Sequence, residues 1–404
     1  MRKRKSEKEA KIAVFQTSEV VFLILVTSVV SCTMGFVFSR GYQKFDENTV
    51  EIKDENLKKI IDNYQYIQDN YYKEIDKKAF VKGAVAGMVE SLGDQYSAVI
   101  DSENSESFNR TLDGWFTGIG VEVGNNEEGN IVISYVFEDS SAKRNGIEVG
   151  DVIISINGTN FEKKSYADAA AYLKKQTNTP IDMVVLRNGS KLTIRNLSKE
   201  KVILQSVVKE IFERNQKKIG YLYISTFSGT TFDQVKKNLE ELEREKIDGL
   251  IIDMRNNTGG HLTSAEKILS LFLDKKHVIY QVQSKTGTTK TYSRGSENKP
   301  YPIAILQNKI TASASEIVSA ALKEEYGATV IGTVSYGKGT IQDLVNGDME
   351  YKVTTKKWLT PKGEWINEIG VEPDLKIELA EEYKNNPSNE TDNQLQTAIN
   401  TLVK

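Results

Sequence analysis

The sequence predicts a mixed α+β chain built in series from an N-terminal membrane helix, a helical lead-in, a small β-rich domain and an α/β core. An uncharged apolar run covers residues 20–38. Apolar residues then recur at helical spacing over residues 48–92 and give way to short apolar strands between turn dipeptides. After residue 203, strands alternate with helical stretches, which is typical of an α/β fold. The length of 404 residues is enough for about two or three domains.

The apolar run is the first element. A helix over residues 20–38 is long enough to cross a bilayer of about 30 Å. Residues 1–19 are basic, so by the positive-inside rule they stay in the cytoplasm and the rest of the chain lies outside. We therefore expect a single-pass anchor in the cell membrane with an extracytoplasmic body. A cleaved signal peptide, a lipid on Cys32, and a buried helix of a soluble domain remain open.

The composition excludes several kinds of chemistry. Cys32 is the one cysteine, so no internal disulfide can form. His261 and His277 are too far apart in the sequence for the helical zinc motif H-E-x-x-H, and we expect no metal and no cofactor. The net charge of −3 argues against a nucleic-acid partner, which would favour a basic surface.

A helical lead-in is expected over residues 48–112, and it could mediate a homodimer. The helical pattern breaks at Gly93-Asp94-Gln95-Tyr96-Ser97, and a polar linker follows.

Residues 113–202 read as a domain of short strands, at 120–124, 131–136, 152–156, 181–186 and 192–197, with one helix. Ser165 and Asp168 form the pattern of a capping box at the start of that helix, which ends near residue 174.

Two stretches of this domain, Gly118-Ile119-Gly120-Val121 and the run AKRNGIEVGDVIISING at 142–158, resemble a PDZ domain in its circularly permuted bacterial form. The resemblance implies that a peptide binds as an added strand and that the backbone amides of the first stretch receive its terminal carboxylate. A small β-rich domain without a ligand is the alternative.

Residues 203–380 are expected to form the α/β core. A strand at 219–224 and a helix at 231–246 precede a buried strand at 248–255, which runs into Asn256-Asn257-Thr258-Gly259-Gly260. Paired glycines let the backbone approach a ligand and turn amides toward it, as an oxyanion hole requires. A turn of this composition is also common as a purely structural element.

The next strand, 303–306, leads into Thr311-Ala312-Ser313-Ala314-Ser315-Glu316 and a helix. Ser313 would lie at the positive end of that helix, beside the free amide of Ala314. This position suits a nucleophile, and it equally suits a helix N-cap.

A third strand, 328–332, precedes Gly337-Lys338-Gly339 and Gln342. Residues 332–338 fit the pattern G-x-x-x-x-G-K, but Gly339 replaces the Ser or Thr of a phosphate-binding loop, and residues 344–355 read as loop and strand instead of a helix. We therefore reject nucleotide binding. A lysine between two glycines is either a buried amine or part of a surface turn.

Together these three segments resemble the C-terminal processing (tail-specific) peptidases, a Ser-Lys protease family with an embedded PDZ domain. The likeness spans roughly residues 50–375, and Thr258 replaces the proline usual in the glycine loop. It implies that Ser313 is the nucleophile and that Lys338, with a pKa lowered by burial, is the base. It also implies that Gln342 orients Lys338, and that the oxyanion is held by the amide of Ala314 and one from Gly259 or Gly260.

The substrates implied are proteins or peptides with free C-termini. Two alternatives remain open, a non-enzymatic membrane-tethered PDZ scaffold and a Ser-His site that uses His261. Residues 381–404 read as a polar linker and an amphipathic helix with Leu395, Ile399 and Leu402, which we expect to dock an unknown partner.

Overall fold

The computed structural model describes residues 53–100, 112–177, 180–345 and 350–404. The chain divides into two units, Met1–Phe80 and Val81–Lys404. The predicted membrane segment, residues 20–38, and the basic residues 1–19 lie outside the described ranges. Within those ranges, no helix is both long and apolar enough to span a membrane.

Two helices lie in the segment where a helical lead-in is expected, α2 (Glu55–Asn70) and α3 (Lys77–Glu90). Asp54 caps α2 by accepting hydrogen bonds from the amides of Asn56 and Leu57. No residue of α2 is buried. The side chains of Leu57, Ile60 and Ile67 lie exposed.

The small β-rich domain contains a sheet in the order β3 (Val121–Asn125), β4 (Ile131–Val136), β5 (Val152–Ile156), β7 (Ile181–Arg187) and β8 (Ser190–Leu197), with β6 (Thr159–Asn160) beside β5. Its helices are α5 (Ser141–Arg144) and α6 (Tyr166–Lys175). The predicted capping box of Ser165 and Asp168 is confirmed at the start of α6. A separate pair of strands, β2 (Trp115–Gly118) and β9 (Glu200–Ile203), was not predicted.

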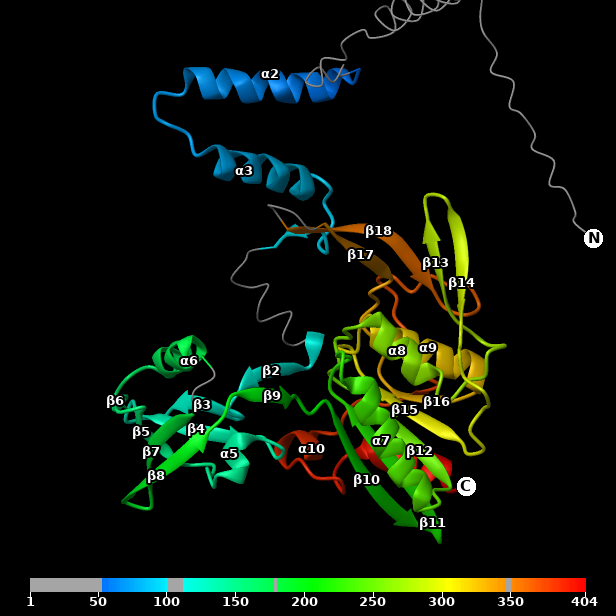
Figure 1. Ribbon diagram of the computed structural model, residues 1–404. Coiled ribbons are helices and arrows are strands. Elements are labelled where there is room, and N and C mark those ends of the chain that lie inside the picture. The colour runs from blue at the N-terminus through cyan, green and yellow to red at the C-terminus, as the bar shows by residue number, and fades with distance from the viewer. Residues whose placement is uncertain (1–52, 101–111, 178–179, 346–349) are drawn as a thin grey trace, which may run out of the picture. The chain divides into compact units, whose positions relative to one another are not determined.

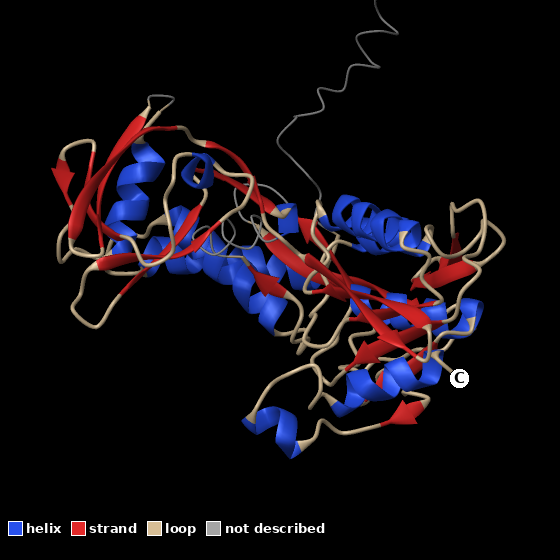
Figure 2. Ribbon diagram, turned by 90° about the horizontal axis from the view of Figure 1, so that it is seen from below, coloured by secondary structure: helices blue, strands red, loops and turns tan. Residues whose placement is uncertain are grey.

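The core is a six-stranded sheet in the order β10 (Val207–Arg214), β11 (Lys217–Ile224), β12 (Gly249–Asp253), β15 (Ile303–Gln307), β16 (Thr329–Gly332) and β19 (Leu375–Lys376). All neighbours are parallel except β10 and β11. Helices cover both faces (Figure 2): α7 (Thr231–Arg244), α8 (Leu262–Leu269) and α9 (Ala314–Ala321) pack on one face, and α11 (Asn393–Leu402) on the other. A one-turn π-helix, Leu322–Tyr326, continues α9.

A second sheet is formed by β1 (Ala98–Val99), β18 (Tyr351–Leu359), β13 (Val278–Ser284) and β14 (Gly287–Tyr292), with β17 (Thr340–Val345) on the other edge of β18 (Figure 1). The strand β17 begins two residues after Lys338, where a phosphate-binding loop would continue into a helix. The rejection of nucleotide binding at this motif is consistent with that strand.

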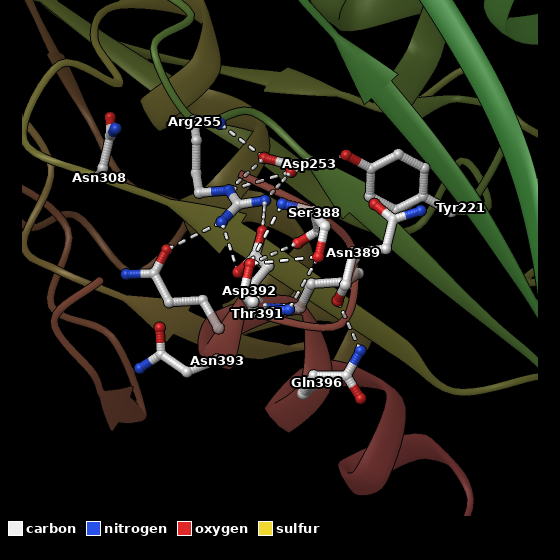
Figure 3. Close-up of polar contacts among 12 residues, drawn as sticks. Tyr221, Asp253, Arg255, Asn308, Ser388, Asn389, Thr391, Asp392, Asn393 and Gln396 are labelled. Atoms are coloured by element: carbon white, nitrogen blue, oxygen red, sulfur yellow. Dashed lines mark hydrogen bonds and ion pairs between the residues drawn. The ribbon is translucent and has the colours of Figure 1, made fainter. Parts of the chain in front are cut away.

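The C-terminal segment forms α10 (Glu381–Asn385) and α11. The expectation that the second helix docks an unknown partner is wrong, because Leu395, Ile399 and Leu402 are buried against the chain's own sheet. A cluster of ion pairs fixes the start of this helix (Figure 3). The guanidinium of Arg255 lies 2.6 Å from the carboxylate of Asp253 and 2.8 Å from that of Asp392, the N-cap of α11.

Candidate active site

The loops that follow three parallel strands converge on one cavity of about 580 Å³. Because the carboxyl ends of parallel strands lie at the same edge of a sheet, the segments after β12, β15 and β16 meet there. The residues that the sequence predicted for this site, all of which line the cavity, are Gly259, Gly260, Ser313, Ala314, Lys338 and Gln342. The predicted peptide-binding residues Gly118, Ile119, Gly120 and Val121 belong to β2, β3 and the loop between them.

Ser313 is the N-cap of α9 and also lines the cavity. Its φ of 58° and ψ of −119° place a side-chain-bearing residue in a backbone region that favours glycine. Such a conformation costs about 1–3 kcal/mol and is concentrated at functional sites. The serine therefore occupies the cap position predicted for it, in a strained turn that presents it to the cavity.

The glycine loop packs directly on the backbone around Ser313. A methyl group added at Gly259 would lie 2.9 Å from the Cβ of Ser313, and one at Gly260 would lie 2.1 Å from the carbonyl oxygen of Phe227. The amide of Gly259 donates to Oδ1 of Asn257 at 2.9 Å. The amides of Gly260 and Ala314 donate to no other residue that the structure describes. These two N–H groups are thus the ones available to an oxyanion.

Lys338 is held by its backbone and is partly buried. Its amide donates to Oε2 of Glu316 at 2.9 Å, and its carbonyl accepts from the indole of Trp358 at 2.7 Å. Burial lowers the pKa of Lys338, and the positive charge of Lys352 lowers this pKa further. The carboxylates of Glu316 and Asp94 act in the opposite direction without reversing the shift.

The contacts expected between the catalytic side chains are absent. Within the described part of the chain, no hydrogen bond joins the amine of Lys338 to Ser313 or to Gln342. The amide nitrogen of Gln342 instead donates to the hydroxyls of Thr340, at 3.0 Å, and Thr354, at 2.9 Å.

His261 lines the cavity as the N-cap of α8. Its ring makes no hydrogen bond or ion pair with any residue in the described ranges. A Ser-His site requires a histidine oriented by a third group, and the structure supplies none for His261 among those residues.

Sequence reasoning missed Glu316 as a functional residue, although Ser313-x-x-Glu316 is the pattern of a capping box. The side chain of Glu316 is fully buried. Its carboxylate accepts hydrogen bonds from the amides of Ser313 (2.7 Å), Gly337 (2.6 Å) and Lys338 (2.9 Å) and from the hydroxyl of Ser335 (2.6 Å). One carboxylate therefore fixes the loop of the serine against the loop of the lysine.

The arrangement has the components of acyl transfer: a hydroxyl at a helix N-terminus, a partly buried amine and two free backbone amides. Among the residues that the structure describes, no group of three or more His, Cys, Asp or Glu side chains is placed to hold a metal ion.

Three stretches of the chain match known protein domains. Residues 218–377 match peptidase family S41, residues 110–186 match the PDZ domain, and residues 36–104 match the N-terminal domain of the activating protease CtpB. The resemblances to PDZ domains and to tail-specific peptidases are thereby confirmed.

Two relatives come from Bacillus subtilis (strain 168). Carboxy-terminal processing protease CtpB is 36% identical over 83% of this chain and 70% of its own length. Carboxy-terminal processing protease CtpA is 32% identical over 90% of this chain and 78% of its own length. A solved structure of the photosystem II D1 C-terminal processing protease is 24% identical, with a TM-score of 0.49 over 79% of this chain and 86% of that one. The chain belongs to the carboxy-terminal processing serine proteases of peptidase family S41.

Proposed function

We propose that this protease is a membrane-anchored endopeptidase that cleaves proteins selected by their C-terminal tails, with Ser313 and Lys338 as a catalytic dyad. One observation carries the proposal. Ser313, Lys338 and the free amides of Gly260 and Ala314 line the same cavity, in which burial lowers the pKa of the lysine.

The chemistry follows from these positions. Neutral Lys338 takes the proton of Ser313 Oγ as the oxygen attacks the scissile carbonyl. The oxyanion accepts hydrogen bonds from the amides of Gly260 and Ala314. Lys338 then protonates the leaving amine, and water hydrolyses the acyl-enzyme. In this proposal, Gln342 orients the amine once Lys338 has turned toward Ser313 and away from the arrangement in the structure, in which no hydrogen bond joins these described residues.

The dyad is tested by the variants Ser313→Ala and Lys338→Ala. Each should lower peptide cleavage at least about 1,000-fold while leaving the melting temperature of the folded chain unchanged. Ser319→Ala and Lys290→Ala are the matched controls, because Ser319 Oγ is buried without a hydrogen bond and Lys290 is exposed on β14. Full activity of either dyad variant would contradict the proposal.

Selection of C-terminal tails is assigned to the loop between β2 and β3. The amides of Ile119 and Gly120 donate to no other residue in the described ranges, so they are available to a terminal carboxylate. Gly120 has a φ of 91°, and a methyl group there would lie 2.0 Å from the Cβ of Ser140. The loop therefore needs glycine at this position.

We assign the membrane anchor to residues 20–38, with the catalytic part outside the cytoplasm. We assign the interface of a homodimer to the exposed apolar face of α2. Exposed fractions of 46% for Leu57 and 47% for Ile60 support the second assignment. Expression with and without residues 1–44 tests both. The full chain should sediment with membranes, and the shortened chain should stay in solution with the mass of two copies. A soluble full chain contradicts the anchor, and a monomeric shortened chain contradicts the dimer.

A further inference from the structure

The amine of Lys338 has an aromatic partner in the structure. It lies 5.0 Å from the centroid of the Tyr96 ring, within the distance at which a cation is attracted to a ring face. Tyr96 belongs to the turn between α3 and β1, at the break that the sequence predicted. In the described chain the amine makes no hydrogen bond with Ser313 or Gln342, and the tyrosine ring is the partner that the structure gives it.

The turn that carries Tyr96 is fixed on β18, whose residue Lys352 lines the cavity. Ser97 Oγ donates to the carboxylate of Asp94 and accepts from the amide of Thr354 in β18 at 3.0 Å. The next residue, Ala98, pairs with Lys352 of the same strand. The amide of Tyr96 itself donates to Asp94 at 3.2 Å. The position of the ring is therefore held by the backbone on both sides.

The ring presents an uncharged face. Burial and a hydrogen bond with Tyr336 raise the pKa of Tyr96 well above its ordinary value, so the phenol stays protonated wherever Lys338 titrates. The negative face of a neutral aromatic ring attracts a protonated amine and has little attraction for a neutral one.

We propose that Tyr96 is a positioning residue of the Ser-Lys site, whose ring holds the protonated amine of Lys338 away from Ser313 and so sets the pH at which Lys338 becomes a base. The inference rests on the proposed dyad. Activation then consists of losing the proton and turning the neutral amine from the ring to the serine.

Other charges act on the same amine. Asp94 in the turn, Glu316 in α9 and Lys352 in β18 act on this amine. Tyr336, in the loop after β16, bonds to Tyr96, and His261 and Glu350 line the same cavity. Lys352 favours the neutral amine, whereas Asp94 and Glu316 favour the charged amine. Replacing the ring with an apolar side chain leaves all of these charges in place.

The test is the pH profile of kcat/KM for the full chain with Tyr96 as Phe, Leu or Trp, because this profile reports the pKa of the base in the free enzyme. Tyr96→Leu removes the ring and should move the acid limb down by about half to one pH unit, which is about 3- to 10-fold more activity on that limb. Tyr96→Phe keeps an aromatic ring and should leave the acid limb at the same pH as in the parent protein. Tyr96→Trp, with the stronger ring, should move the limb up.

The control is Tyr72→Leu, which removes another tyrosine with a lysine amine over its ring, that of Lys73 at 5.1 Å, outside the cavity. Its profile should match the parent. An unmoved limb in Tyr96→Leu, or equal shifts in the Leu and Phe variants, overturns the inference. If the Leu variant does not fold, the acid limbs of the Phe and Trp variants are compared. Acid limbs at the same pH in these two variants overturn the inference. Activity in Ser313→Ala or Lys338→Ala would instead overturn the dyad.

Discussion

A buried carboxylate joins the two halves of the candidate site. Glu316 accepts from the backbone of Ser313 on one side and from Gly337 and Lys338 on the other. Its side chain is fully buried, and these donors together with the hydroxyl of Ser335 satisfy its oxygens. The relative position of the proposed nucleophile and the proposed base therefore depends on a residue that need not touch the substrate.

We predict that Glu316→Gln lowers kcat/KM at least about 100-fold, because an amide has one acceptor oxygen and its NH₂ group would face the N–H donors. The free energy of unfolding should fall by about 2–4 kcal/mol. Glu324→Gln is the matched control, since Glu324 accepts a bond from the amide of Lys362 at an exposed position. Parent kinetics in Glu316→Gln, measured beside denaturant unfolding, would contradict this role.

At the scale of single residues, the sequence predicts the candidate reactive groups more reliably than it predicts the residues that position those groups. Ser313, Lys338 and the two glycines were predicted because their chemistry is tied to the ends of apolar strands and to short local motifs. The contact of Tyr96 with Lys338 joins residues far apart in the chain, so no local spacing reports it. The same is true of the contacts that place Gln342 between Thr340 and Thr354 instead of against the lysine.

Among the elements, strands with two buried faces or clear boundaries were predicted well. The strands β4 and β5 have the bounds that the sequence predicted, because apolar runs with turn residues beside them mark both. The strands β10 and β14 were missed. Most of their side chains are exposed, so they carry no hydrophobic alternation.

The last helix shows why an amphipathic pattern does not identify its own partner. Leu395, Ile399 and Leu402 predict the apolar face of α11 correctly, but what covers that face is set by the tertiary fold. Burial alone would lower the pKa of Arg255, yet the carboxylates of Asp253 and Asp392 raise it. This ion cluster fixes the start of α11 beside the end of β12, immediately before the glycine loop.

For the whole molecule, the protease core and the PDZ domain supply two different kinds of recognition. The cavity is lined by Ser313 and Lys338, the proposed dyad. In the loop between β2 and β3, the amides of Ile119 and Gly120 donate to no other residue that the structure describes. A carboxylate on two backbone amides gains charge-assisted hydrogen bonds that an amide terminus cannot reproduce. In the proposed selection by tails, the group that is recognised is the last one of the substrate, remote in sequence from the bond that is cut.

We expect amidation of the C-terminus of a substrate peptide to lower kcat/KM about 10- to 100-fold, because a bond between backbone N–H and a charged acceptor contributes about 1.5–3 kcal/mol. The measurement compares one peptide with a free or an amidated C-terminus at the same enzyme concentration. N-terminal acetylation of that peptide is the control, since it also removes one charge but leaves the carboxylate intact, and it should leave the rate unchanged. Equal rates for the free and amidated peptides would show that the carboxylate is not read, even in a chain whose Ser313 and Lys338 prove essential for cleavage.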